Sequence, residues 1–261
     1  MTEIISRFIS YSLYLSIPTV LCAGFLYHFL PYNSQQSKWC FSGLMLVFAA
    51  ALLKVSLVRE GWMLQHPVAY FFPIWYTLSF GVLLFYAVKT RLYPAYRLRG
   101  SDIKHFILPA LQAFFFIGIY FLVARSVKLN LLQDFIPTYY KPVEGAFFIV
   151  LFFSYLALAF RYIKYKQAVL RKRGFEQGAQ RLERLRRMVK VLFFLGGINT
   201  SYILSDFFAW QFLGLNLYTV KGFASLNDLS FAAMGLWLGW FAWCEYRSPA
   251  SKNKENTIKP A

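Results

Sequence analysis

The stretch of sequence that decides the fold runs from His66 to Pro109 and reads HPVAYFFPIWYTLSFGVLLFYAVKTRLYPAYRLRGSDIKHFILP. It holds an apolar segment, 69–88, and then a short loop with five cations before the next apolar segment begins at Phe106. About 20 apolar residues in a helix cross roughly 30 Å of hydrocarbon. Short loops rich in lysine and arginine stay on the cytoplasmic side. The stretch therefore predicts a membrane protein and assigns this loop to the inside.

Similar apolar segments recur along the whole chain. They predict an all-α, polytopic membrane protein with seven spanning helices in one domain, 1–246, at about 8–30, 39–58, 69–88, 106–127, 145–165, 191–215 and 225–246. The last residues, 247–261, are polar, contain two prolines and show no apolar periodicity. We expect them to form a disordered cytoplasmic tail.

Composition supports this class. Hydrophobic residues make up 58% of the 261 residues and charged residues only 15%, whereas soluble domains carry about 25% charged residues. The formal net charge is +17. Since the cations lie in loops between apolar segments, membrane topology explains this charge better than nucleic-acid binding, and we expect no direct contact with nucleic acid.

The distribution of cations predicts the orientation. With the amino end outside and the carboxyl end inside, 21 of the 28 lysines and arginines lie on the inner side. Six of the other seven lie on the outer side. Lys54 lies near the outer end of the second span, and we expect its long side chain to reach the outer water. The predicted location is a membrane that the chain crosses several times.

The connection 161–190 is the most basic part of the chain, with eleven cations. It is predicted to extend the fifth and sixth helices beyond the bilayer. Leu182, Leu185 and Val189 recur at helical spacing among arginines, which suits an amphipathic helix on the anionic inner leaflet or a docking surface for a cytosolic protein. A solvated loop is the alternative. The candidate contact residues are Arg171, Lys172, Arg173, Arg181, Arg184, Arg186 and Arg187.

Ionisable and polar residues inside spans are costly and therefore mark candidate sites. Several such residues are predicted to lie toward the outer side of the membrane, and they suggest a ligand-binding pocket there. The candidate residues are Asp206, Asp228, Asn227, Asn199, Glu60, His66 and Glu144. In the alternative interpretation, these groups pair with Arg59, Arg125, Lys141 or helix-end backbone and hold the bundle together.

Metal and catalytic sites are not indicated. The three histidines are predicted to lie far apart, and Cys22, Cys40 and Cys244 have neither disulfide nor zinc spacing. The motifs HExxH and GxSxG and a glycine-rich phosphate loop are absent from the sequence. We expect no metal, no cofactor and no catalytic residue.

Small residues in the seventh span predict a close helix contact. Gly235 and Gly239 form a small-xxx-small face, which suits packing within the bundle or a homodimer. Paired glycine or proline interruptions, which are typical of broken transport helices, are not evident in the sequence. Pro73 lies inside the third span, where neighbouring helices tolerate a proline.

A resemblance rests on residues of the opening stretch: His66, Pro67, Pro73, Tyr76, Leu78, Gly81, Leu83, Leu84, Phe85, Tyr86, Tyr93, Pro94, Arg97, Asp102, His105, Phe106 and Pro109. This pattern resembles the seven-helix membrane domain that precedes the AraC-type helix-turn-helix domain in some bacterial membrane-anchored transcription regulators. We expect this chain to lack the DNA-binding domain of that family, and Val82 follows Gly81 where the family commonly has proline. The resemblance implies a membrane sensory or signal-transducing module.

The hairpin that joins the third and fourth predicted spans is interpreted as structural. Pro94 and Gly100 would shape its turn, and Asp102 would cap the helix that begins near Ile103.

The leading prediction is a non-enzymatic, multi-pass protein of a bacterial inner (cytoplasmic) membrane that senses a ligand or membrane state from the outer side and acts through a cytosolic partner. Three alternatives stay open. The first is a small-solute transporter with Asp206 and Asp228 on its path, the second an integral membrane enzyme acting on a lipid-linked substrate, and the third a structural subunit of a membrane complex.

Overall fold

The computed structural model describes residues 2–30, 34–215, 217 and 220–247. Within these ranges the chain is helical and contains no strand. Five helical segments are long and apolar enough to cross a membrane: Phe8–His28, Gln35–Arg59, Gly100–Leu122, Arg125–Lys172 and Gly178–Leu213. The chain is therefore an all-α membrane protein. The predicted tail lies outside the described residues, apart from Arg247.

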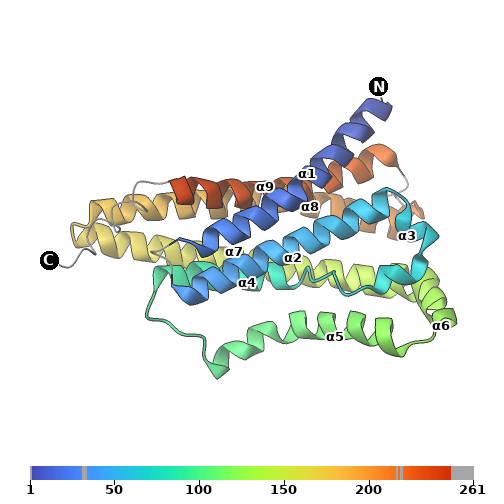
Figure 1. The fold of residues 1–261 in the computed structure, drawn as a ribbon, viewed down its shortest axis with the longest axis horizontal. Helices are drawn as coiled ribbons and strands as arrows, with labels where there is room; N and C mark the ends of the chain where they lie inside the picture. The colour runs from blue at the N-terminus through green and yellow to red at the C-terminus, as the bar shows by residue number, and fades with distance from the viewer. Residues whose placement is uncertain (1, 31–33, 216, 218–219, 248–261) are drawn as a thin grey trace.

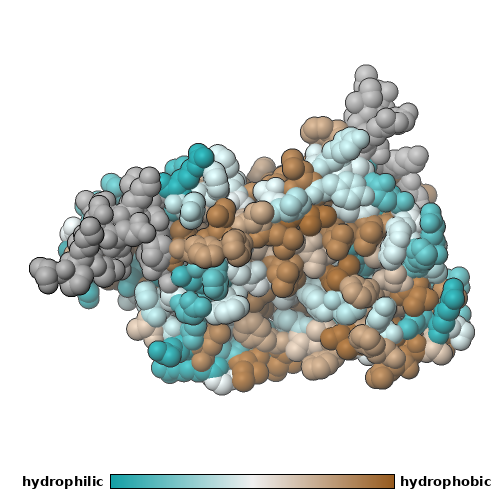
Figure 2. Space-filling view, viewed as in Figure 1, coloured by the Kyte–Doolittle hydropathy of each residue, from teal (hydrophilic) through white to brown (hydrophobic). Residues whose placement is uncertain are grey.

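Six helices form a bundle along the long axis (Figure 1): α1 (Thr2–His28), α2 (Gln35–Arg59), α4 (Ser79–Leu92), α7 (Lys141–Lys172), α8 (Glu176–Leu213) and α9 (Lys221–Arg247). They pack in a ring in the order α1, α2, α4, α7, α8 and α9, and α9 returns to α1. Figure 2 shows brown apolar surface over the middle of the molecule and teal polar surface toward both ends of its long axis. This is the pattern of a bundle with an apolar belt.

Aromatic side chains fill the main core of the bundle. Phe48 of α2 stacks on Phe80 of α4 and on Phe231 of α9, with ring centroids 4.2 and 5.2 Å apart. The backbones of α4 and α7 approach each other closely at Gly81, because a Cβ atom added there would lie 3.0 Å from the Leu151 carbonyl oxygen. A glycine is needed there for the two backbones to approach.

The third predicted span is not one continuous helix. A short helix, α3 (Trp62–Gln65), and a 3-10 helix, η1 (Pro67–Phe71), precede an irregular segment, 72–78, and α4 begins only at Ser79. The prediction of a helix over 69–88 is thus wrong for its first ten residues. Pro73 has no amide hydrogen and disfavours helical backbone at Phe72, whose ψ angle is 132°. We call 72–78 the unwound segment.

Helix α5 (Ile107–Leu122) lies apart from the other helices in Figure 1 and follows the 3-10 helix η2 (Gly100–Phe106). A second, smaller apolar cluster supports it, in which Phe116 and Ile119 pack with Phe71 and Ile136. The opposite face of α5 exposes large apolar side chains: Leu111, Phe114, Phe121 and Leu122. In a membrane this face lies against lipid.

The connection from α5 to α7 is helical, although the sequence suggested an outer loop there. Helix α6 (Arg125–Asn130) leads into a π-helix, η3 (Leu131–Tyr140), which continues directly into α7. The fourth predicted span, 106–127, accordingly ends at Leu122. Wide helical turns of this type are rare and often lie at functional sites.

The glycine face of α9 packs within the chain. A Cβ atom added to Gly235 would lie 3.1 Å from Val20, and one added to Gly239 would lie 3.6 Å from Thr19, both on α1. A second copy would have to displace α1 to use this face.

Candidate functional site

Glu144 lies in the first turn of α7 and faces the unwound segment. Its Oε1 atom accepts hydrogen bonds from the Trp75 indole, from the Thr77 hydroxyl, and at 2.7 Å from the Gln112 amide. Three donors from the unwound segment and α5 thus converge on one carboxylate oxygen. Such bonds to an ionised group offset the cost of removing it from water. We call Glu144, Trp75, Thr77 and Gln112 the Glu144 cluster.

Gln112 attaches α5 to the unwound segment. Its Oε1 atom accepts the backbone N–H of Leu78 at 3.1 Å, and its Nε2 atom also lies 3.2 Å from the Tyr140 hydroxyl. Leu78 directly precedes α4, where backbone N–H groups have no partner within the helix. Gln112 satisfies one of them and is buried. It is the only amide side chain on an otherwise apolar helix.

Lys54 of α2 lies beside this cluster and not in water. It is 3% exposed, and its Nζ atom donates to the Tyr70 carbonyl oxygen at 3.0 Å. The same atom lies 4.0, 4.7 and 5.1 Å from the ring centroids of Tyr70, Phe116 and Trp75. The expectation that Lys54 reaches the outer water is therefore wrong. Three aromatic faces, which we call the aromatic cage, replace the water around the ammonium group.

Trp75 connects the two charged groups. Its ring faces the Lys54 ammonium while its Nε1–H donates to Glu144. The indole also packs against both apolar clusters, that of the bundle and that of α5. A change at either charge therefore acts on the residue that lies between the bundle and α5.

The structure distributes the predicted pocket residues over several places. Asp228 of α9 pairs with Arg59 of α2 at 3.3 Å, and Arg59 also donates to Ser10 of α1 at 3.1 Å. Both ends of the pair are mostly buried. This contact agrees with the alternative interpretation, in which Asp228 pairs with Arg59 and holds helices together.

Other predicted pocket residues also have local partners. Asn199 donates to Asn227 at 3.0 Å and to Ser230 at 3.1 Å, which joins α8 to α9. Asp206 accepts the backbone N–H of Leu217 at 2.9 Å. Two further residues lie in the turn after α2: Glu60, at the end of that helix, and His66, whose ring lies 4.8 Å from Trp62. Glu144 belongs to the separate cluster described above.

Four residues of this site escaped the sequence analysis: Lys54, Trp75, Thr77 and Gln112. Two signals in the sequence pointed to them. Lys54 and Gln112 are polar residues inside apolar segments, and such residues are expected to have a specific partner. Trp75 and Thr77 gave no signal of their own, since their role depends on the unwound segment.

A second charged cluster holds the other end of α4. The Arg91 guanidinium donates to Glu245 of α9, and Arg184 of α8 lies 3.7 Å from the same carboxylate. The Glu245 side chain is 4% exposed. We call these three residues the Glu245 cluster. They lie at the end of the bundle where α7 and α8 are connected, which we call the hairpin end.

The loop between α4 and α5 is organised by Asp102. Its carboxylate accepts hydrogen bonds from the Tyr86 and Tyr96 hydroxyls at 2.8 and 2.6 Å and from the Arg99 backbone at 2.8 Å. Burial and then the bond to Asp102 raise the pKa of Tyr96 to about 12. Asp102 is the third residue of η2, and its bond to Arg99, the residue that precedes η2, is that of a capping box. Asp102 therefore caps a helix, as expected, but this helix is η2, which begins at Gly100 and not near Ile103.

The predicted contact residues of 161–190 lie on a hairpin that α7 and α8 form. Arg184 lies near Glu245, and Arg186 lies 3.6 Å from Glu183 and over the Phe160 ring. The other five are exposed: Arg171, Lys172, Arg173 and Arg181 at or near the turn, and Arg187 further along α8. The hairpin thus presents a basic surface.

Comparison with known proteins gives no relative for this chain: no family model, no curated protein and no solved structure matches it. Function is therefore inferred from the residues and their geometry.

Proposed function

We propose that this chain is a seven-span sensory module of a bacterial inner membrane that passes a signal from the outer half of its bundle to a cytosolic partner. The amino end lies outside and the carboxyl end inside. In this topology the third span consists of η1, the unwound segment and α4. The hairpin end carries most cations and therefore lies in the cytoplasm.

The observation that carries the proposal is the position of α4 between two charged clusters. Its first turn is held by the Glu144 cluster through Thr77 and Leu78, and its last turn is held by Arg91 in the Glu245 cluster. The 13 steps along the helix from Leu78 to Arg91 span about 20 Å. A movement at the first end of a rigid helix reaches the second end.

The Glu144 cluster is suited to having two states. Its three donors depend on one carboxylate oxygen, so loss of the charge or a competing ligand would weaken all three bonds together. The unwound segment and α5 would then be free to shift. A signal of this kind requires that the two arrangements differ in affinity for the ligand or proton.

Distances measured between spin labels in lipid nanodiscs test the proposal. The labels are placed at two exposed positions, Ala95 beyond the end of α4 and Lys172 at the end of α7, in a chain whose three cysteines are replaced by alanine. We expect Glu144→Gln to shift the distance distribution. Glu60→Gln, which neutralises an exposed carboxylate at the far end of α2, should leave it unchanged. Identical distributions in Glu144→Gln and the unsubstituted chain would overturn the proposal.

The unwound segment also favours a second candidate, a proton-coupled transporter. Transport sites near the middle of a membrane often use a broken helix, and here the break faces a buried carboxylate. Proteoliposomes with an internal pH-sensitive dye distinguish the two functions. A transporter would carry protons under an imposed membrane potential and lose this activity in Glu144→Gln, whereas a sensor would leave the internal pH unchanged.

A further inference from the structure

The turn of the α7–α8 hairpin lies beyond the other helices at the hairpin end. Tyr162 of α7 lies level with the end of α4, since its ring centroid is 6.2 Å from that of Tyr93. The ten residues that follow Tyr162, up to Lys172, add about 15 Å of helix beyond that point. Figure 1 shows the α7 and α8 ribbons extending past α4 on this side. The turn is therefore remote from the apolar belt.

The turn has a defined conformation. Gly174 has a φ angle of 75°, which favours glycine, and the backbone N–H of Phe175 donates to the Leu170 carbonyl at 3.0 Å. Below the turn, Gln167 of α7 donates to the Ala179 carbonyl at 3.3 Å and to Glu183 at 3.0 Å, both on α8. These bonds fix the two helices relative to each other.

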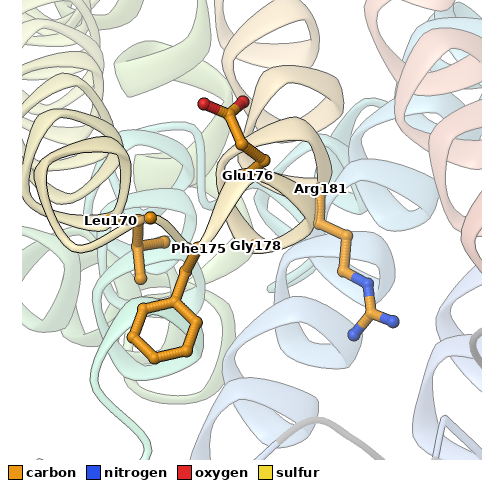
Figure 3. Close-up of a pocket in the computed structure, with 6 residues that line it drawn as sticks. Leu170, Phe175, Glu176, Gly178 and Arg181 are labelled. Atoms are coloured by element: carbon orange, nitrogen blue, oxygen red, sulfur yellow. The ribbon is translucent and has the colours of Figure 1, made fainter.

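This ordered turn exposes an aromatic side chain. Phe175 is 62% exposed and, together with Leu170, Gly178 and Arg181, lines an open depression of about 480 Å³. In Figure 3, Leu170 and Phe175 lie on one side of the turn, and the Arg181 side chain extends on the other. Phe175 falls between two membrane-span candidates, which end at Lys172 and begin at Gly178. Lipid in the apolar belt therefore does not account for its exposure.

The charge around the depression is strongly positive. The segment 161–190 holds eleven cations and two acidic residues, Glu176 and Glu183. Glu183 already accepts a bond from Gln167 and lies near Arg186. The exposed cations nearest the turn are Arg171, Lys172, Arg173 and Arg181. A complementary partner is therefore acidic and brings an apolar side chain to Phe175.

We infer that the turn is a docking site for an acidic amphipathic helix of a soluble cytosolic protein. The apolar face of that helix would pack on Phe175 and Leu170, and its carboxylates would pair with the surrounding arginines. The membrane that holds the chain is a poorer occupant, because the turn projects away from it along the bundle axis. The inference rests on the proposed function for its orientation and names the partner's chemistry.

The test measures binding of two synthetic peptides to the full chain in phosphatidylcholine nanodiscs. One is an 18-residue helical peptide with glutamates on one face and leucines on the other, and its companion has alanines in place of the leucines. Both have the same charge. We expect the leucine peptide to bind about tenfold more tightly, since it buries apolar area against Phe175.

Substitutions then locate the contact. Phe175→Ser should reduce the difference between the peptides to about twofold or less, because it removes the apolar partner of the leucines. Tyr165→Ser is the matched control: Tyr165 is a similarly exposed aromatic residue, 67%, on the stem of the hairpin. It should leave the difference intact.

Three results would overturn the inference. The two peptides bind equally to the unsubstituted chain, or Phe175→Ser has no more effect than Tyr165→Ser, or phosphatidylserine in the nanodisc abolishes binding because the turn lies on lipid. Failure here is separate from failure of the proposed function, since the spin-label distances between residues 95 and 172 require no partner.

Discussion

The two clusters at the ends of α4 hold a buried glutamate in different ways. Glu245 lies close to two guanidinium groups, those of Arg91 and Arg184. Glu144 instead accepts bonds from an indole, a hydroxyl and an amide, and the Lys54 ammonium beside its cluster is enclosed by aromatic rings. Fixed positive charge makes the Glu245 cluster depend on an ionised acid, whereas Glu144, which is held by neutral donors, can lose its charge at a smaller cost in stability even though its bonds weaken. The comparison identifies the Glu144 cluster as the contact of α4 that can change between two arrangements.

The largest expected effect is that of Glu245→Ala. It leaves two arginines without their buried carboxylate, and we expect the free energy of unfolding to fall by about 3 to 5 kcal/mol. Thermal unfolding in detergent measures this. Glu183→Ala serves as the control, because Glu183 is about two-fifths exposed and its loss should cost less than about 1 kcal/mol. Equal stability of the two variants would contradict the assignment of the Glu245 cluster.

A pair of substitutions at Glu144 should have a smaller and graded effect. Glu144→Ala leaves the donors of Trp75, Thr77 and Gln112 without an acceptor and should cost about 2 to 4 kcal/mol. Glu144→Gln keeps an acceptor oxygen and should cost about 1 kcal/mol or less. The same unfolding assay applies. If both variants are equally unstable, the charge of Glu144 is itself required for stability, and the Glu144 cluster is not the contact that can change.

Next comes Gln112→Leu, which keeps the volume of the side chain and removes its hydrogen bonds to the unwound segment. We expect a loss of about 1 to 2 kcal/mol and faster amide hydrogen exchange across α5, while α2 is unaffected. Leu111→Ala, on the exposed face of the same helix, is the control and should not change the exchange. Unaltered exchange in Gln112→Leu would show that packing of Phe116 alone holds α5.

The smallest expected effect on stability is the difference between alanine substitutions at two glycines. Gly81→Ala places a methyl group 3.0 Å from the Leu151 carbonyl, so α4 must move away from α7 at a cost of about 1 to 3 kcal/mol. Gly118→Ala on α5 meets no atom within 4 Å and should be neutral or slightly stabilising. Unfolding of the two variants in parallel tests whether α4 is held closely against α7.

Much of the bundle could be predicted from apolar length. Five of the predicted spans lie almost entirely within the helices α1, α2, α7, α8 and α9, and the first four of these helices each contain a segment long and apolar enough to cross a membrane. The extension of the basic connection as helices was likewise visible in its periodicity. The break in the third span could not be predicted from the sequence, since many membrane helices contain a proline like Pro73 without unwinding.

The site was harder to predict than the bundle, because its members are distant in sequence. Lys54 was expected in water since nothing in its own helix shows that Tyr70 and Phe116 will enclose it. Glu144 was identified as a site residue but grouped with Asp206 and Asp228 on predicted depth. Depth along a helix does not specify the direction of a side chain, and the unwound segment that Glu144 faces was read as helix.

The central claim is that α4 couples the Glu144 cluster to the Glu245 cluster. A double-mutant cycle with Glu144→Gln and Arg91→Gln measures this coupling through the free energies of unfolding, with Glu144→Gln and Asp228→Asn as a reference pair. Residues this far apart are ordinarily additive within about 0.5 kcal/mol. We predict a coupling energy above about 0.5 kcal/mol for the first pair and additivity for the second. Additivity in both pairs would contradict the account.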